Sequence, residues 1–292
     1  MLIPCGVSHS LTEREKQLQI REYAEALREA AHSIGSHGLT REQFDASGLF
    51  QAAIERIRGT KSATMMDKRL FIRRVLDHLK NLGEIAGWES SGGRDRHDYE
   101  VTFPDQRISV IEAKGCLDGN NTTIFTRPAN ADEFVIWSLC QNAGANMEKN
   151  VWSGIHTRLG PEMMASSKHV DGLIVWDGLC GTDQRVCPKL VAQPARGTDL
   201  GFASPVPPPC LYLFPRTIPD YRNNPNPAPW PLEEIRIMEV LHRVFQGDQD
   251  DTAEVRFEAR HNGKDVTRIT KICRAGVEVR VSKAQEIRRA KG

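Results

Sequence analysis

Two acids and a lysine near the middle of the chain are residue types that could carry out chemistry together. Asp98 precedes the alternating segment 99–103, and Glu112 and Lys114 end the apolar segment 107–114. Side chains two positions apart on a strand project from the same face, so Glu112 and Lys114 must point together. Burying charged groups at the end of an apolar strand is costly, and a chemical role would explain their presence.

Two carboxylates beside an amine suit the hydrolysis of a phosphodiester. A hard cation such as Mg²⁺ prefers oxygen ligands and keeps several waters, so one or two carboxylates are enough to hold it. The cation stabilises charge on the phosphate, and an ammonium group can orient the attacking water or stabilise the developing negative charge. If the segments 98–103 and 107–114 form a hairpin around Pro104 and Asp105, then Asp98 comes close to the other two residues.

Asp98, followed fourteen positions later by Glu112-Ala113-Lys114, resembles the core motif of the PD-(D/E)xK nuclease superfamily. The order helix, strand hairpin, helix and strand, up to the segment 172–176, resembles the αββαβ core of this restriction-endonuclease-like family. The resemblance implies that Asp98 and Glu112 bind Mg²⁺ and that Lys114 assists the nucleophile. His97 departs from the family pattern, because it stands where proline precedes the first acid.

The same resemblance points to two accessory residues. Glu84 lies at the end of the helix before the hairpin, where many members place a further metal ligand. Gln141 lies in the helix expected after the motif and could point toward the site, as a glutamine does in some branches. For both residues, an ordinary exposed position on a helix is the alternative.

Polar and basic loops on either side of the motif are candidates for DNA contacts. Asn and Arg commonly read base edges, whereas Ser and Thr often contact phosphate. We therefore expect DNA contacts from the loop after Lys114 and from the Gly-rich loop before Asp98, namely Asn120, Asn121, Thr122 and Arg127 in the first and Arg94 and Arg96 in the second. A plain polar turn is the alternative for the first loop.

The surrounding pattern predicts an α/β (α+β) fold with a restriction-endonuclease-like mixed central sheet flanked by helices. Residues 1–62 are expected to form an N-terminal helical region, and 63–246 the nuclease core with a Pro-rich insertion at 188–231. Within that core, residues 131–159 look helical, with an interruption near Gly144. The alternating residues of 247–292 predict a small, basic, β-rich C-terminal region.

Composition narrows the class of protein. The hydrophobic fraction of 39% and the charged fraction of 26% are those of a globular protein, and no apolar run reaches the length of a membrane span. Seven cysteines without a Cys-x-x-Cys pair indicate reduced thiols, and with no secretory signal we expect a cytoplasmic protein. The net charge is only +1, yet residues 256–292 hold eleven lysines and arginines against four acids, a patch that could attract phosphate.

These observations predict a magnesium-dependent endonuclease that cuts double-stranded DNA, most like a type II restriction enzyme. Cutting both strands favours a homodimer, and a cognate DNA methyltransferase could act separately. A repair, junction-resolving or transposon-end nuclease of the same fold is a second interpretation. A third is a DNA-binding protein without catalysis, in which Glu112 and Lys114 form a structural ion pair.

Overall fold

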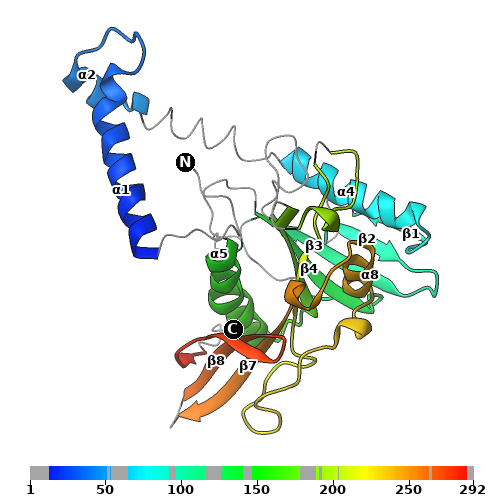
Figure 1. The fold of residues 1–292 in the computed structure, drawn as a ribbon. Coiled ribbons are helices and arrows are strands. Elements are labelled where there is room, and N and C mark those ends of the chain that lie inside the picture. The colour runs from blue at the N-terminus through cyan, green and yellow to red at the C-terminus, as the bar shows by residue number, and fades with distance from the viewer. Residues whose placement is uncertain are drawn as a thin grey trace.

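The computed structural model of the chain describes residues 13–50, 53, 65–91, 97–115, 117, 126–140, 147–177, 189–190, 193–202, 204–262 and 265–287. One mixed sheet dominates it, with the strand order β1-β2-β3-β4-β5-β6-β7-β8-β10 and with β9 also paired to β8 (Figure 1). The strands are β1 (Gly87–Ser90), β2 (Tyr99–Thr102), β3 (Ile108–Lys114), β4 (Glu133–Cys140), β5 (Gly172–Asp177), β6 (Cys210–Leu213), β7 (Thr252–Asn262), β8 (Asp265–Arg274), β9 (Val277–Val281) and β10 (Gln285–Glu286).

The directions of the strands divide the sheet into distinct parts. β1, β2 and β3 form an antiparallel meander, and β4 and β5 then run parallel to β3. β6 pairs antiparallel with β5 and parallel with β7, which forms a long hairpin with β8. Because β3, β4 and β5 share one direction, their carboxyl ends lie at one edge of the sheet and their amino ends at the opposite edge. Lys114 belongs to the carboxyl edge, whereas Glu133 belongs to the amino edge.

Helices cover both faces of the sheet. On one face lie α4 (Met65–Asn81) and α8 (Arg236–Val244), and on the other lies the continuous run of α5 (Met147–Ser153), the π-helical segment η2 (Gly154–Leu159) and α6 (Gly160–Ser166). The short 3-10 turns are η1 (Ala31–Ser33), η3 (Pro194–Arg196), η4 (Leu232–Glu234) and η5 (Gln249–Asp251). None of the helices in the described segments is long and apolar enough to cross a membrane.

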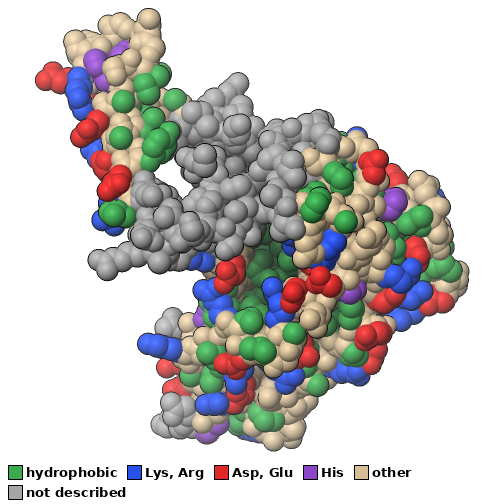
Figure 2. Space-filling view, viewed as in Figure 1, with side chains coloured by type: hydrophobic (Ala, Val, Ile, Leu, Met, Phe, Trp, Pro, Cys, Tyr) green, Lys and Arg blue, Asp and Glu red, His purple; other side chains and the backbone are tan. Residues whose placement is uncertain are grey.

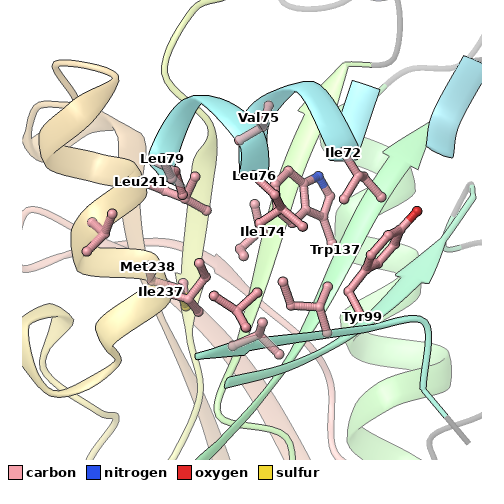
Figure 3. Close-up of a cluster of buried hydrophobic side chains, with 14 of the residues drawn as sticks. Ile72, Val75, Leu76, Leu79, Tyr99, Trp137, Ile174, Ile237, Met238 and Leu241 are labelled. Carbon is pink, nitrogen blue, oxygen red and sulfur yellow. The ribbon is translucent and has the colours of Figure 1, made fainter. Parts of the chain in front are cut away.

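The helical period of α4 explains its position on the sheet. Ile72, Val75, Leu76 and Leu79 recur at helical spacing, and all four are fully buried against the strands (Figure 3). They pack onto side chains of β3, β4, β5 and α8, among them Ile111, Trp137, Ile174, Ile237, Met238 and Leu241. Residues at the alternate positions of the same strands, such as Val110, Phe134 and Ile136, form a second core cluster under η2 and α6. The central strands are therefore buried on both faces.

One prediction about this region is wrong. The segment 131–159 was expected to be helical, but its first part is the strand β4, and the helix α5 begins only at Met147. Phe134 to Trp137 are apolar and fully buried on both faces of the sheet, which is the environment of a central parallel strand. From α4 to β5, the described elements therefore run helix, four strands, helix and strand. The strand β1 was not predicted from the sequence.

The predicted C-terminal and Pro-rich regions both contribute strands to the one sheet. The strands of the expected C-terminal region, residues 247–292, are not separate, since β7 pairs directly with β6 and continues the same sheet. The Pro-rich segment 188–231 contributes β6 to the middle of that sheet, so it is part of the core. The N-terminal region does contain helices, α1 (Glu13–Ala30) and α2 (Arg41–Ser47), and both extend away from the sheet (Figure 1).

Candidate active site

The register of the β2–β3 hairpin brings the three candidate residues together. Tyr99 pairs with Ile111, and the Asp98 N–H donates to the Ile111 carbonyl over 3.0 Å, so the ladder places Asp98 opposite Glu112. Directly opposed residues of an antiparallel pair have neighbouring side chains on one face. Lys114 shares that face, since it lies two positions after Glu112 on β3. The predicted hairpin is confirmed.

Hydrogen bonds fix these side chains at the carboxyl edge. Lys114 Nζ lies 2.7 Å from Glu112 Oε1, and the Ala113 N–H donates to Asp98 Oδ2 over 2.9 Å. Glu112 is only 5% exposed, whereas Asp98 is half-buried. The site therefore has one acid inside the sheet edge and one at its rim, with the ammonium group of Lys114 in contact with the inner acid.

Burial and two neighbouring charges shift the pKa of the Glu112 carboxyl. Burial raises the pKa of the Glu112 carboxyl, the hydrogen bond and charge of Lys114 lower it, and the negative charge of Asp98 raises it again. A carboxylate that is desolvated and beside a second carboxylate is stabilised when a positive charge binds between them. A cation bound between Asp98 and Glu112 would therefore reduce the repulsion between the two carboxylates.

The oxygens of Asp98 and Glu112 can be compared with the ligands that Mg²⁺ requires. Among the described residues, Asp98 Oδ1 and Glu112 Oε2 take part in no hydrogen bond, so each carboxylate has one oxygen left for a cation. No cluster of three or more Asp, Glu, His or Cys side chains that could hold a metal occurs in the described part of the chain. Two carboxylate oxygens fit Mg²⁺, which usually keeps several waters, better than a cation that needs an all-protein cage.

Three residues that the sequence did not suggest hold the chain as it leaves β3. Ser138 Oγ of β4 donates to the Gly115 carbonyl over 2.8 Å, and Asn150 Oδ1 of α5 accepts from the Leu117 N–H over 3.0 Å. Gly154 allows this close approach, because a Cβ there would lie 2.2 Å from the Leu117 Cβ. Ser138 and Asn150 are both buried, and a polar residue inside the apolar run 134–139 was the signal in the sequence that could have indicated Ser138.

The structure does not bring Glu84 to this site. Glu84 follows α4 next to Ala86, whose N–H donates to Thr102 at the far end of β2 from Asp98. Its two carboxylate oxygens pair with the Arg243 guanidinium of α8 at 2.7 and 2.6 Å. The hydrogen bond to Arg243 lowers the pKa of the Glu84 carboxyl, which identifies an ion pair between helices. The prediction of Glu84 as a metal ligand of this site is corrected accordingly.

Arg127 is also placed away from the site. It lies before β4, at the amino edge, and its guanidinium forms an ion pair with the buried Asp171. It therefore joins two strands at the edge opposite Lys114, and the expectation that it contacts DNA near the motif is corrected. Other predicted residues lie outside the described residues, namely Asn120, Asn121, Thr122, Arg94, Arg96 and Gln141.

The amino edge has its own polar cluster around a cavity of about 250 Å³. Glu133 accepts hydrogen bonds from the first N–H groups of α8 and pairs with Arg107 at 3.0 Å. The cavity is lined mainly by acids, which makes it unsuitable for phosphate; its lining residues are Arg107, Asp132, Glu133, Asp171, Trp230, Glu233, Glu234 and Ile235.

The basic C-terminal strands are largely neutralised. Arg256 and Arg260 pair with Glu254 and Glu258, each two positions earlier on β7, at 2.7 and 2.6 Å. Arg268 is 2% exposed, and burial lowers its pKa to about 10. Basic and acidic side chains are intermixed over the part of the molecule that holds β7 and β8 (Figure 2). The excess of basic residues in the sequence therefore does not form a free basic surface among these residues.

Comparison with known proteins adds no assignment to this geometry. No protein-family model matches the chain, and neither the curated proteins nor the solved structures contain a significant match.

Proposed function

We propose that this protein is a magnesium-dependent DNA endonuclease, most like a type II restriction enzyme of the PD-(D/E)xK superfamily. One observation carries the proposal. Asp98, Glu112 and Lys114 lie on one face at the carboxyl edge of a central sheet, and each carboxylate has one oxygen that no described residue binds. In open α/β sheets, the carboxyl ends of strands are where ligands usually bind.

Each residue has a distinct role in the proposed reaction. Asp98 and Glu112 would hold Mg²⁺, which supplies positive charge to the phosphate and acidifies a water. Asp98 Oδ2 is fixed by the Ala113 N–H, so its other oxygen has a defined direction. Lys114 holds its ammonium group beside Glu112, where it can orient the attacking water and stabilise negative charge on the phosphate. Gly115 and Leu117, held by Ser138 and Asn150, keep the end of β3 rigid.

A second candidate function rests on the 2.7 Å contact between Lys114 and Glu112. That contact favours a DNA-binding protein in which the pair only stabilises the strand end. Ion pairs with the same spacing occur on β7, at Glu254–Arg256 and Glu258–Arg260. These pairs are more exposed than the pair on β3, and no second carboxylate lies opposite them on β8. Burial and the presence of Asp98 therefore distinguish the β3 pair and favour the nuclease.

The test is cleavage of supercoiled plasmid DNA by the purified chain during a magnesium titration. We expect magnesium-dependent nicking or linearisation that Glu112→Gln and Lys114→Ala abolish, while both variants still bind DNA. Glu258→Gln is the matched control, because it removes an acid from an i, i+2 strand pair outside the site, and it should cut normally. Wild-type cleavage by both site variants would reject Glu112 and Lys114 as the active site. DNA binding without any magnesium-dependent cleavage would instead support the non-catalytic function.

The same digestion separates the kinds of nuclease. Discrete, reproducible fragments support a restriction enzyme, for which we propose a homodimer and a cognate methyltransferase that protects the site. Preferential cutting of branched substrates supports a junction-resolving enzyme. Cleavage near damage or at transposon ends supports repair or mobile-element functions of the same fold.

A further inference from the structure

Two arginines on α4 differ from most other arginines of the molecule. Six arginines on the sheet and in the C-terminal half lie against acids, in the pairs Arg107–Glu133, Arg216–Glu234, Arg243–Glu84, Arg256–Glu254, Arg260–Glu258 and Arg280–Glu148. Arg69 and Arg73 are exposed, and neither forms an ion pair with an acid of the described residues. Asp77, one turn after Arg73, is already bound by Trp88 Nε1 at 2.9 Å. Within the described residues, no acid neutralises the positive charge of either arginine, although Arg73 shares a side-chain hydrogen bond with Tyr99.

The two arginines lie on one side of α4, which covers the face of the sheet that holds Ile111, whereas Glu112 and Lys114 project from the other face. Residues four apart on a helix are neighbours on its surface, about 6 Å apart along the axis. Arg74 is not part of this pair, because its guanidinium donates to the Gly201 carbonyl over 3.0 Å and lies over the Phe202 ring. The buried face of the same helix turn holds Ile72, which lies beside Tyr99 in Figure 3. The outer face with Arg69 and Arg73 is thus fixed rigidly to the sheet.

Tyr99 links this helix face to the catalytic edge. Burial raises the pKa of the Tyr99 hydroxyl, Arg73 lowers it, Asp98 raises it, and Arg69 lowers it. The hydroxyl therefore lies within electrostatic reach of both arginines and of the Asp98 carboxylate. Tyr99 begins β2 and directly follows Asp98. Arg69 and Arg73 therefore lie at the end of β2 where Asp98 is.

We propose that Arg69 and Arg73 bind phosphates of the DNA strand that reaches the site across the carboxyl edge of the sheet, beside Tyr99. The proposal rests on the function proposed above. Two exposed guanidinium groups on a rigid helix suit neighbouring phosphates, which they can bind in a bidentate manner. Such contacts position the duplex without reading its sequence, so they would place the scissile phosphate at Asp98 and Glu112 whatever the recognition site is.

The test is a salt titration of DNA binding by the full chain in EDTA, where no cleavage occurs. Each lost phosphate contact lowers the slope of log Kobs against log salt by about 0.9, so Arg69→Gln/Arg73→Gln should lower it by about 2. Binding should weaken by about tenfold or more on duplexes of unrelated sequence, because the contacts are to phosphate. Arg69→Lys/Arg73→Lys should keep the wild-type slope.

Arg260→Gln is the matched control, since it removes an exposed arginine that is already paired with Glu258, and it should leave the slope unchanged. If the wild-type chain cuts DNA and the double Gln variant binds with the wild-type slope and affinity, this inference is overturned and the nuclease proposal stands. If the wild-type chain neither binds nor cuts DNA, both fail. A weakened affinity on one sequence alone would also overturn the inference, because it would indicate base readout.

Discussion

The two edges of the parallel strands both carry buried acids, but the acids are partnered differently. At the amino edge, Asp171 Oδ2 accepts from the Phe134 N–H at 2.7 Å and pairs with Arg127, and Oδ1 lies 3.1 Å from His169 Nδ1. At the carboxyl edge, Lys114 is the one hydrogen-bond partner that Glu112 has among the described residues. Asp171 and Glu112 are almost equally buried, at 2% and 5% exposed. Burial alone therefore does not distinguish the two edges.

Partners decide what a buried acid can do. Burial raises the pKa of both Glu133 and Glu112, but at Glu133 two backbone N–H groups of α8 and the charge of Arg107 lower it. At Glu112 only Lys114 lowers it, and Asp98 adds to the rise. An acid bound on both oxygens joins structural elements, and removing it leaves several donors unpaired. An acid beside a second carboxylate, with one oxygen that no described residue binds, can instead serve as a ligand for the proposed cation.

The largest expected effect is at the amino edge. Asp171→Ala leaves the Arg127 guanidinium and the Phe134 N–H without their buried acceptor, and we expect it to lower the free energy of unfolding by about 3–5 kcal/mol. Asp171→Asn keeps an acceptor and should cost clearly less. Urea denaturation followed by circular dichroism measures both. A loss below about 1 kcal/mol for Asp171→Ala would show that this edge is not the structural one.

At the carboxyl edge we expect a substitution of the buried acid to raise the free energy of unfolding instead of lowering it. The folded-state pKa of Glu112 is raised, so the stabilisation that its protonated form provides is present at low pH and is lost as pH rises through that folded-state pKa. In EDTA at neutral pH, Glu112→Gln should therefore raise the free energy of unfolding, by about 0.5–2 kcal/mol, even though it abolishes cleavage.

The gain from Glu112→Gln should shrink as pH falls toward the ordinary range of a glutamate, where the wild-type carboxyl is protonated. Thermal unfolding at several pH values, with Glu258→Gln as the control from an exposed strand pair, measures this. A loss of stability as large as that of Asp171→Ala would mean that both edges serve the fold.

The carboxyl edge could be predicted from sequence because its geometry is local. Two strands joined by a short turn at Pro104 and Asp105 fix their own register, and the period of two then places Glu112 and Lys114 on one face. The helix α4 could be predicted for the same reason, since its apolar spacing is contained within a single element.

The amino edge could not be predicted, because its contacts join residues far apart in the sequence. Asp171 meets Arg127 across 44 positions, and Glu133 meets the start of α8 across more than 100. The apolar run of β4 is compatible with a buried helix or a buried strand, and only its pairing between β3 and β5 decides for the strand. Likewise, a count of basic residues at the C-terminus cannot show that β7 places an acid beside each of its arginines.

The smallest expected effect tests Glu84, an acid that the motif suggested but the fold placed elsewhere. Its partner Arg243 has a half-exposed side chain, so the ion pair is worth at most about 1 kcal/mol. The folded-state pKa of Glu84 is lowered, so its contribution is present above the unfolded-state pKa and is lost as pH falls through the folded-state value. Glu84→Gln should therefore cost a few tenths of a kcal/mol near neutral pH and nothing in acid, while leaving the magnesium dependence of cleavage unchanged. If Glu84→Gln instead abolishes cleavage at wild-type stability, a third acid serves the site and the division between the two edges is incomplete.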